Sequence, residues 1–299
     1  MSPTFIAGFD GTDGSLAAVH FATRLGREVA ADVVAVTGYA VPSHIAGKGA
    51  SDGSDAALAD AARGEADRTL AGLDADGVAQ RIARAGGAAQ ALIETADDLN
   101  AKLIVVGTRD ATGMRRVKLG STAERVVHGA PCPVAIVPYS VGAGAPEAIA
   151  VAYDGRGPAL TALAYAAALA RLFSARLALI AVTEPFLDGR WEGNGADSRI
   201  RSDIVDHADA AAAALRPELE VEVRTEVGAP REAILAACTD DIDLLVTGSR
   251  AYGPLHATLV GSVSHHLAAH ARCPVIVVPR QLEQVDAIVD GALLPEGAG

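Results

Sequence analysis

Cysteine is scarce in this chain of 299 residues: there are three, and none belongs to a C-x-x-C pair. So small and odd a number argues against a disulfide framework and fits a reducing compartment. No run of 18 or more apolar residues occurs, so no membrane span is expected. The first residues enter a strand-like segment without the basic leader of a secretory signal, and we therefore expect a cytoplasmic protein.

Positive charge is also in short supply. The chain has 25 lysines and arginines against 37 aspartates and glutamates, which gives a formal net charge of −12. Acidic residues are spread through both halves. Because this balance repels a phosphate backbone, general nucleic-acid binding is not expected.

The sequence contains an internal repeat. Ala130–Pro138 returns as Ala271–Pro279, 141 positions later, and Leu103–Arg109 returns as Leu244–Arg250 at the same offset. Such matches, spread over the chain, predict a duplicated domain. We expect the domains at 1–140 and 146–280, followed by a tail at 281–299.

Each half alternates short apolar strands with helices. In the second half, strands are expected at 148–152, 177–182, 221–227, 243–247 and 275–278, and helices at 160–173, 197–215, 231–239 and 262–270. The period-two alternation of 221–227 is typical of a strand near an edge. Buried strands separated by helices predict an α/β fold: two tandem, doubly wound domains, each a mostly parallel five-stranded sheet with helices on both faces.

A ligand of such a sheet is expected beyond the carboxyl ends of strands, where the strand order reverses. The loop after the fourth strand of the first half contains the most suitable groups. Gly107 lets the chain leave the strand, and Gly120 lets backbone come close to a ligand. Ser121 is expected to cap the next helix in a capping box with Glu124. Amide groups at that helix start, with Arg115, Arg116 and Lys118 on the approach, predict an anion site.

These residues resemble the universal stress protein family, whose nucleotide-binding members have G-x-x-G-x9-G-[ST] after the fourth strand. The resemblance spans about residues 4–139 and 147–280. It includes an aspartate that ends the first strand, a G-[ST]-R turn, the Gly-Ser pair and the A-x-C-P-V strand entry. It implies the adenine-nucleotide alpha-hydrolase-like fold, stress-linked expression, dimer-like packing of the two halves through their last strands, and a possible further homodimer.

The resemblance also implies a ligand, ATP or a related adenine nucleotide with magnesium, and a set of site residues. Asp10 and Asp154 match the aspartate beside adenosine, and Gly38 and Val182 fall near the position whose backbone meets adenine. The phosphate-loop positions are Gly107, Arg109, Gly120, Ser121 and Thr122 in the first half, and Gly248, Arg250, Gly261, Ser262 and Val263 in the second. No residue is implied to be catalytic or to hold a metal.

Both halves depart from the motif at its second glycine, where Asp110 and Ala251 stand. The substitutions leave open a nucleotide-free dimerisation or scaffold protein. A nucleotidyl transferase or ATP pyrophosphatase is a further alternative, but the chain has no H-x-G-H motif and only a faint echo, at Asp10–Ser15, of an S-G-G-x-D-S loop. A non-enzymatic binding protein is therefore expected, with slow ATP hydrolysis left open.

Structural explanations compete with several of these assignments. Asp10 and Asp154 could organise the turn before the next helix, and tight-turn geometry could explain Gly120 and Gly261. His266 and His270 lie four apart on a helix, but without a marked third ligand a solvated helix face is favoured over zinc. Cys132 and Cys273 are interpreted as buried small hydrophobes, with a redox pair as the weaker alternative.

Overall fold

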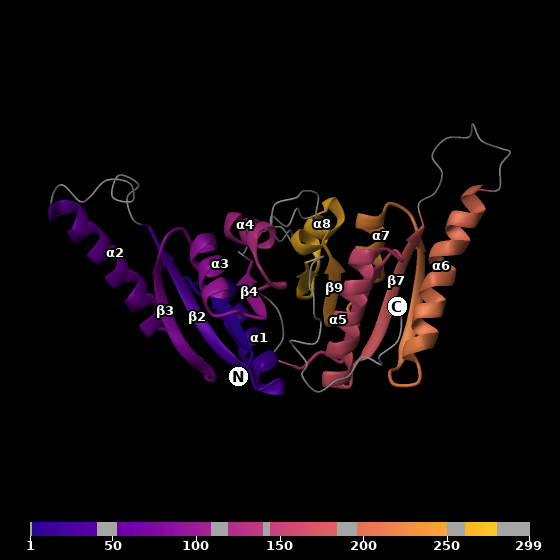
Figure 1. The fold of residues 1–299 in the computed structure, drawn as a ribbon, viewed down its shortest axis with the longest axis horizontal. Coiled ribbons are helices and arrows are strands. Elements are labelled where there is room, and N and C mark those ends of the chain that lie inside the picture. Colours follow the sequence, from indigo (N-terminus) through magenta and orange to yellow (C-terminus); the bar gives the residue numbers. More distant parts are fainter. Residues whose placement is uncertain are drawn as a thin grey trace. The chain divides into compact units, whose positions relative to one another are not determined.

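The computed structural model describes residues 2–40, 53–108, 119–139, 144–183, 196–249 and 261–279. The chain divides into two compact units, Met1–Ala143 and Gly144–Gly299, each with its own strands and helices (Figure 1). No helix within the described ranges is long and apolar enough to cross a membrane. The expected tail at 281–299 lies outside these ranges.

The first unit alternates strands and helices. Its elements are β1 (Thr4–Gly8), α1 (Asp13–Glu28), β2 (Asp32–Tyr39), α2 (Gly53–Ala71), β3 (Val78–Ala85), α3 (Ala88–Asp98), β4 (Leu103–Gly107), α4 (Ser121–Gly129) and β5 (Val134–Val137). The strands lie in the order β3-β2-β1-β4-β5, and every recorded pairing between them is parallel.

The second unit repeats this arrangement. Its elements are β6 (Ala148–Tyr153), α5 (Gly157–Phe173), β7 (Arg176–Thr183), α6 (Ala196–Leu215), β8 (Val221–Val227), α7 (Pro230–Ala237), β9 (Leu244–Gly248), α8 (Ser262–His270) and β10 (Val275–Val278). The order β8-β7-β6-β9-β10 is the same as the order of the corresponding strands in the first unit, and the pairs are again parallel. β8 lies at the edge, as its alternating sequence predicts. The expected fold is therefore confirmed.

The central strand of each sheet is buried from both sides. Phe5, Ile6 and Ala7 of β1 have no exposed surface, and Ile149 and Ala150 of β6 have none either. Right-handed crossovers place α1 and α2 on one face of the first sheet and α3 and α4 on the other. Each central strand can therefore be apolar throughout, and the polar groups gather at the strand ends.

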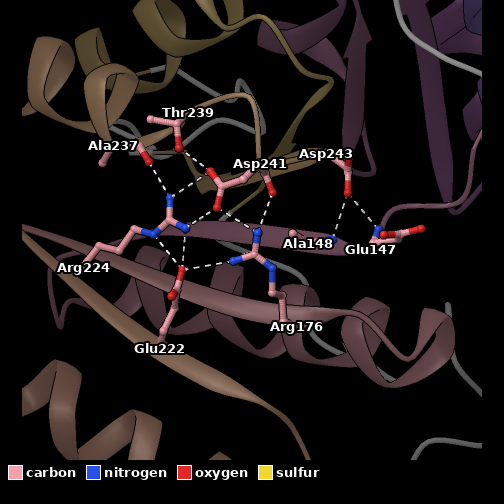
Figure 2. Close-up of polar contacts among 9 residues, drawn as sticks. All are labelled: Glu147, Ala148, Arg176, Glu222, Arg224, Ala237, Thr239, Asp241 and Asp243. Atoms are coloured by element: carbon pink, nitrogen blue, oxygen red, sulfur yellow. Dashed lines mark hydrogen bonds and ion pairs between the residues drawn. The ribbon is translucent and has the colours of Figure 1, made fainter.

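A charged network joins the amino ends of β7, β8 and β9 in the second unit (Figure 2). Arg224 donates to Asp241 at 2.6 Å and to Glu222 at 2.7 Å, and Arg176 donates to Asp241 at 2.8 Å. The hydroxyl of Thr239 also donates to Asp241. Hydrogen bonds from Arg224, Thr239 and Arg176 hold the pKa of Asp241 well below its usual range.

Replacing Asp241 with asparagine is expected to destabilise the second unit at neutral pH. The side chain is 41% exposed, so solvent screens the network and the loss is about 1 kcal/mol at most. Because the folded pKa is depressed, the stabilisation is fully present above the unfolded pKa of about 4. It is lost as pH falls through the lower folded pKa.

Urea unfolding of wild type and Asp241→Asn from pH 7 down to pH 2 measures this difference. The gap is expected to stay constant to about pH 5 and to shrink below about pH 4. Asp240→Asn is the matched control, because Asp240 and its partner Arg272 are 89% and 78% exposed. A gap that grows on acidification would contradict the assignment.

Candidate functional site

The strand order reverses beside the central strand of each unit. β1 pairs with β2 on one side and β4 on the other, and β6 pairs with β7 and β9 in the same way. Successive connections leave the central strand in opposite directions here, which opens a crevice at the carboxyl edge in folds of this kind. The structure therefore places the ends of β1 and β4, and of β6 and β9, at the position expected for a ligand.

Asp10 organises the turn between β1 and α1. Its Oδ1 accepts hydrogen bonds from the Thr12 backbone N–H at 3.2 Å and from the Thr12 hydroxyl at 2.6 Å. Thr12, not Asp10, is the N-cap of α1, since its side chain accepts from the N–H of Ser15 at 3.3 Å. Gly11 supplies the left-handed conformation that the turn needs, with φ +81°. Asp10 thus has a structural role that fixes the direction of its carboxylate.

Asp154 makes the equivalent turn before α5. Its Oδ1 accepts from the N–H of Arg156 at 3.0 Å, and Gly155 has φ +74°. The Arg156 guanidinium lies 3.8 Å from Asp154 Oδ2, whereas Thr12 occupies that position in the first unit. The two turns share a backbone plan but differ in charge.

Gly107 and Gly248 are required by the fold itself. A Cβ on Gly107 would lie 1.9 Å from the carbonyl oxygen of Gly14, in the first turn of α1. A Cβ on Gly248 would lie 2.2 Å from the carbonyl oxygen of Pro158 in α5. The first turn of α1 therefore packs directly against the end of β4, and the first turn of α5 against the end of β9. Only glycine leaves room for this contact, in agreement with the role expected for Gly107.

Gly38 also has a packing explanation. A Cβ there would lie 2.7 Å from the Cα of Ala88, at the start of α3. Val182 occupies the corresponding place near the end of β7, half-buried. Both residues lie at the carboxyl ends of their strands, where the resemblance places the adenine.

The predicted serine cap at Ser121 is wrong, and Ser262 does not cap the corresponding helix of the second unit either. α4 begins at Ser121 with Gly120 as its N-cap, and α8 begins at Ser262 with Gly261 as its N-cap; neither N-cap residue has a side chain to hydrogen-bond with the helix. The serines already have helical backbone, so they stand one position too late to fold back over the first turn. The first internal bonds run from Glu124 N–H to Gly120 and from His265 N–H to Gly261.

Within the described ranges, no N-cap side chain therefore caps the amide groups of the first turn. In an α-helix the first N–H groups have no partner inside the helix. Here they belong to Ser121 and Thr122 in α4, and to Ser262 and Val263 in α8. Ser121 and Ser262 are exposed and Thr122 and Val263 half-exposed, so a ligand could reach both starts. The positive end of the helix dipole favours an anion there.

Tight-turn geometry does not explain Gly120. Its backbone, at φ −68° and ψ 154°, is one that any residue adopts. Among the described residues, nothing lies within 4 Å of a Cβ built on it. Gly261 has a similarly ordinary backbone, at φ −63° and ψ 153°. Glycine at position 120 therefore keeps the helix start clear of every described side chain, which suits close approach of a ligand.

The rest of the loop lies outside the described residues. Arg109 and Arg250 belong to this part, as do Asp110 and Ala251 at the second glycine of the motif, and the basic residues Arg115, Arg116 and Lys118. Their assignments stay predictions.

The two helix starts are not identical. Ser264 in the first turn of α8 donates to the carbonyl of Gly248 at 2.6 Å, and its hydroxyl lies 3.5 Å from that of Thr247. The corresponding residues of the first unit are Ala123 and Val106, both buried and apolar. Side-chain hydrogen bonds thus fasten the second helix start to its strand.

The histidines of α8 form a stacked pair. The rings of His266 and His270 have centroids 4.1 Å apart, and His270 Nδ1 lies 2.9 Å from the His266 carbonyl. Burial and the neighbouring His270 lower the pKa of His266. Within the described ranges, no three histidine, cysteine or acidic side chains form a group able to hold a metal ion.

The cysteine thiols are shielded. Burial raises the pKa of Cys132 and of Cys273 to about 12. The reactive thiolate is therefore scarce at neutral pH. This agrees with the interpretation of both as packing residues.

Comparison with known proteins decides the family. Residues 1–138 and 147–279 each match the model described as the universal stress protein family. The chain belongs to the universal stress protein family. Two matches in one chain make it a tandem, two-domain member.

Individual relatives agree with this assignment. A universal stress protein of Thermus aquaticus is 34% identical over 134 residues, which are 44% of this chain and 98% of the relative. One of Mycobacterium tuberculosis is 39% identical over 88 residues, 27% of this chain and 28% of the relative. The crystal structure of an Archaeoglobus fulgidus universal stress protein is similar with a TM-score of 0.70 at 22% identity, covering 94% of this chain and 99% of that one. At that identity the likeness supports the fold alone.

Some residues near the site were not identified from the sequence. Thr12 was missed as the N-cap of α1, although a threonine two residues after Asp10 is a typical capping signal. Gly14 was missed as the partner of Gly107, because a contact between segments so far apart leaves no local pattern. Thr108 and Ser249, buried beside the first glycines, were read only as part of the turn.

Proposed function

We propose that this universal stress protein binds ATP, or a related adenine nucleotide, as a regulatory ligand in a stress response, and that it is not an enzyme. The observation that supports this most is the pair of helix starts at Gly120 and Gly261, which have no side-chain cap within the described part of the chain and follow strands beside the reversal point of each unit. Gly120 adds open space and an ordinary backbone. A protein without a ligand there gains nothing from glycine, since serine or aspartate would cap the helix better.

The residues present fit an anionic ligand. The amides of Ser121 and Thr122, and of Ser262 and Val263, would donate to phosphate oxygens. Magnesium, when bound with a triphosphate, supplies the charge compensation that an acidic chain needs. The turns of Asp10 and Asp154 would hold their carboxylates beside the ribose, and the backbone of Gly38 and Val182 would meet the adenine. Both units are proposed as sites, with unequal affinity because Arg156 and Ser264 have no counterpart in the first.

A nucleotide-free scaffold is the second candidate. One observation favours it: Gly107, Gly248 and Gly38 are each required by packing, so these glycines would persist in a protein that binds nothing. The same argument does not extend to Gly120, which no described neighbour requires. The binding function is therefore preferred.

Nucleotide analysis separates the candidates. Protein denatured directly after purification is expected to release adenine nucleotide, and the ligand-free protein is expected to be stabilised by ATP–Mg. At a ligand concentration 100 times the dissociation constant, the stabilisation is about 2.7 kcal/mol. Neither released nucleotide nor a thermal shift would support the scaffold, and sustained release of diphosphate would support an enzyme.

A further inference from the structure

Among the described residues, two buried hydroxyls just beyond the ends of β4 and β9 have no hydrogen-bond partner. Thr108 is 1% exposed and Ser249 is not exposed at all. Within the described part of the chain, neither Thr108 Oγ1 nor Ser249 Oγ has a partner. They follow Gly107 and Gly248 directly and occupy the same position of the repeat, 108 and 249.

Buried polar atoms without partners are uncommon, because desolvation removes water and nothing replaces it. Valine or alanine would fill either position without this penalty. Finding the same unsatisfied group in both units argues against an accident of packing in one of them. Other hydroxyls at this edge are satisfied: Thr37 donates to the carbonyl of Phe9 at 2.6 Å.

The direction of the hydroxyls follows from their neighbours. In the second unit Thr247 faces Ser264 of α8, whereas Gly248 faces Pro158 of α5. Because side chains alternate along a strand, Ser249 points to the same side as Thr247, toward the first turn of α8. In the first unit Gly107 faces Gly14 of α1, so Thr108 points to the opposite side, where α4 lies.

We infer that the hydroxyls of Thr108 and Ser249 are additional phosphate ligands, each donating a hydrogen bond to the anion held at the adjacent helix start. The inference rests on the proposed function. Both oxygens are closed to water in the ligand-free arrangement, so the contact forms with a local movement that accompanies binding. The unsatisfied hydroxyl then gains a charged acceptor, which is a stronger partner than a neutral one.

Isosteric removal of the hydroxyls tests the inference. Thr108→Val and Ser249→Ala are titrated with ATP–Mg and with adenosine, alongside the wild type. Each variant is expected to lower the ATP affinity of its own site about tenfold. The adenosine affinity is expected to stay unchanged, because only the contact with phosphate is lost. The ligand-free Thr108→Val protein is expected to melt at the same temperature as wild type or about 2–4 °C higher, since an unsatisfied group has gone.

Thr37→Val is the matched control. It makes the same chemical change in the same unit but deprives the Phe9 carbonyl of its donor, so it is expected to lower the melting temperature. Wild-type ATP affinity retained in both Thr108→Val and Ser249→Ala would overturn the inference and leave the proposed function intact. An equal loss of affinity for ATP and for adenosine would also overturn the inference. If the wild-type protein bound no ATP, both the inference and the proposed function would be overturned. The wild-type titration alone would show this result.

Discussion

Replacing Gly107 with alanine is expected to destabilise the first unit strongly. The added Cβ would lie 1.9 Å from the Gly14 carbonyl oxygen and 2.9 Å from the Ser15 nitrogen. These are backbone atoms at the start of a helix, which cannot move aside as the end of a side chain can. We expect a loss of about 3 kcal/mol or more in the free energy of unfolding. This corresponds to a fall of about 6–12 °C in the melting temperature of that unit.

Gly120→Ala is the matched control for this experiment. It makes the same change in the same motif, at a position where a Cβ meets no described atom within 4 Å. Its melting temperature is expected to fall by no more than about 2–4 °C, because alanine is a poorer N-cap than glycine but meets no neighbour. Calorimetry of both ligand-free variants measures the difference. If Gly107→Ala melted with the wild type, the close approach of β4 and α1 would be wrong.

A double variant with aspartate at Gly120 and Gly261 is expected to lose ATP binding while remaining folded. Aspartate is a good N-cap, and it improves on glycine by a few tenths of a kcal/mol. Its carboxylate would occupy the same first-turn amides that the phosphate is proposed to use, and it would repel the phosphate. We expect the ATP affinity to fall by about 100-fold or more, since hydrogen bonds to charged groups contribute about 1.5–3 kcal/mol each. Isothermal titration with ATP–Mg measures the loss.

Gly64→Asp provides the charge control in the first unit. Gly64 lies in α2 (Gly53–Ala71), where a Cβ would meet no described atom within 4 Å, so the substitution adds the same charge away from the proposed site. Its ATP affinity is expected to stay within about threefold of wild type, because solvent and salt screen the charge. An equal loss from Gly64→Asp would mean that net charge, not the α4 start, controls binding.

The fold could be predicted from the sequence because its signals are repeated and local. The apolar strand at 275–278 and the helix at 262–270 were predicted with the bounds that the structure shows. The helix expected at 160–173 begins earlier, at Gly157. Pro158 is compatible with the first turn of a helix, and the apolar periodicity that guided the prediction starts only after it.

The site could be predicted only in outline. The strand ends that hold Asp10 and Asp154 follow from the sheet rule and the repeat. The helix caps do not, because a one-residue difference in where α4 starts changes Ser121 from a cap into a first-turn residue. The distinction between Gly107 and Gly120 also needs coordinates: both are glycines of one motif, but only Gly107 is required by a neighbouring helix.

The network around Asp241 was not predicted from the sequence either. Arg176, Glu222 and Arg224 come from two adjacent strands, and Asp241 belongs to the segment before a third. The first unit has Asp32 in place of Arg176 and Ile82 in place of Arg224, so the repeat gives no hint of such a cluster. Contacts of this kind depend on strand register, which the sequence pattern leaves undetermined.

Amide spectroscopy of the helix starts tests the proposed site most directly. In nitrogen-15 spectra of the whole protein, addition of ATP–Mg is expected to move the backbone resonances of Ser121 and Thr122, and of Ser262 and Val263, more than those around Gly64 in α2. Adenosine is expected to leave these four nearly in place, because it has no phosphate. Saturable ATP binding that leaves the four amides unmoved would contradict the proposal that phosphate is held at the glycine-led helix starts.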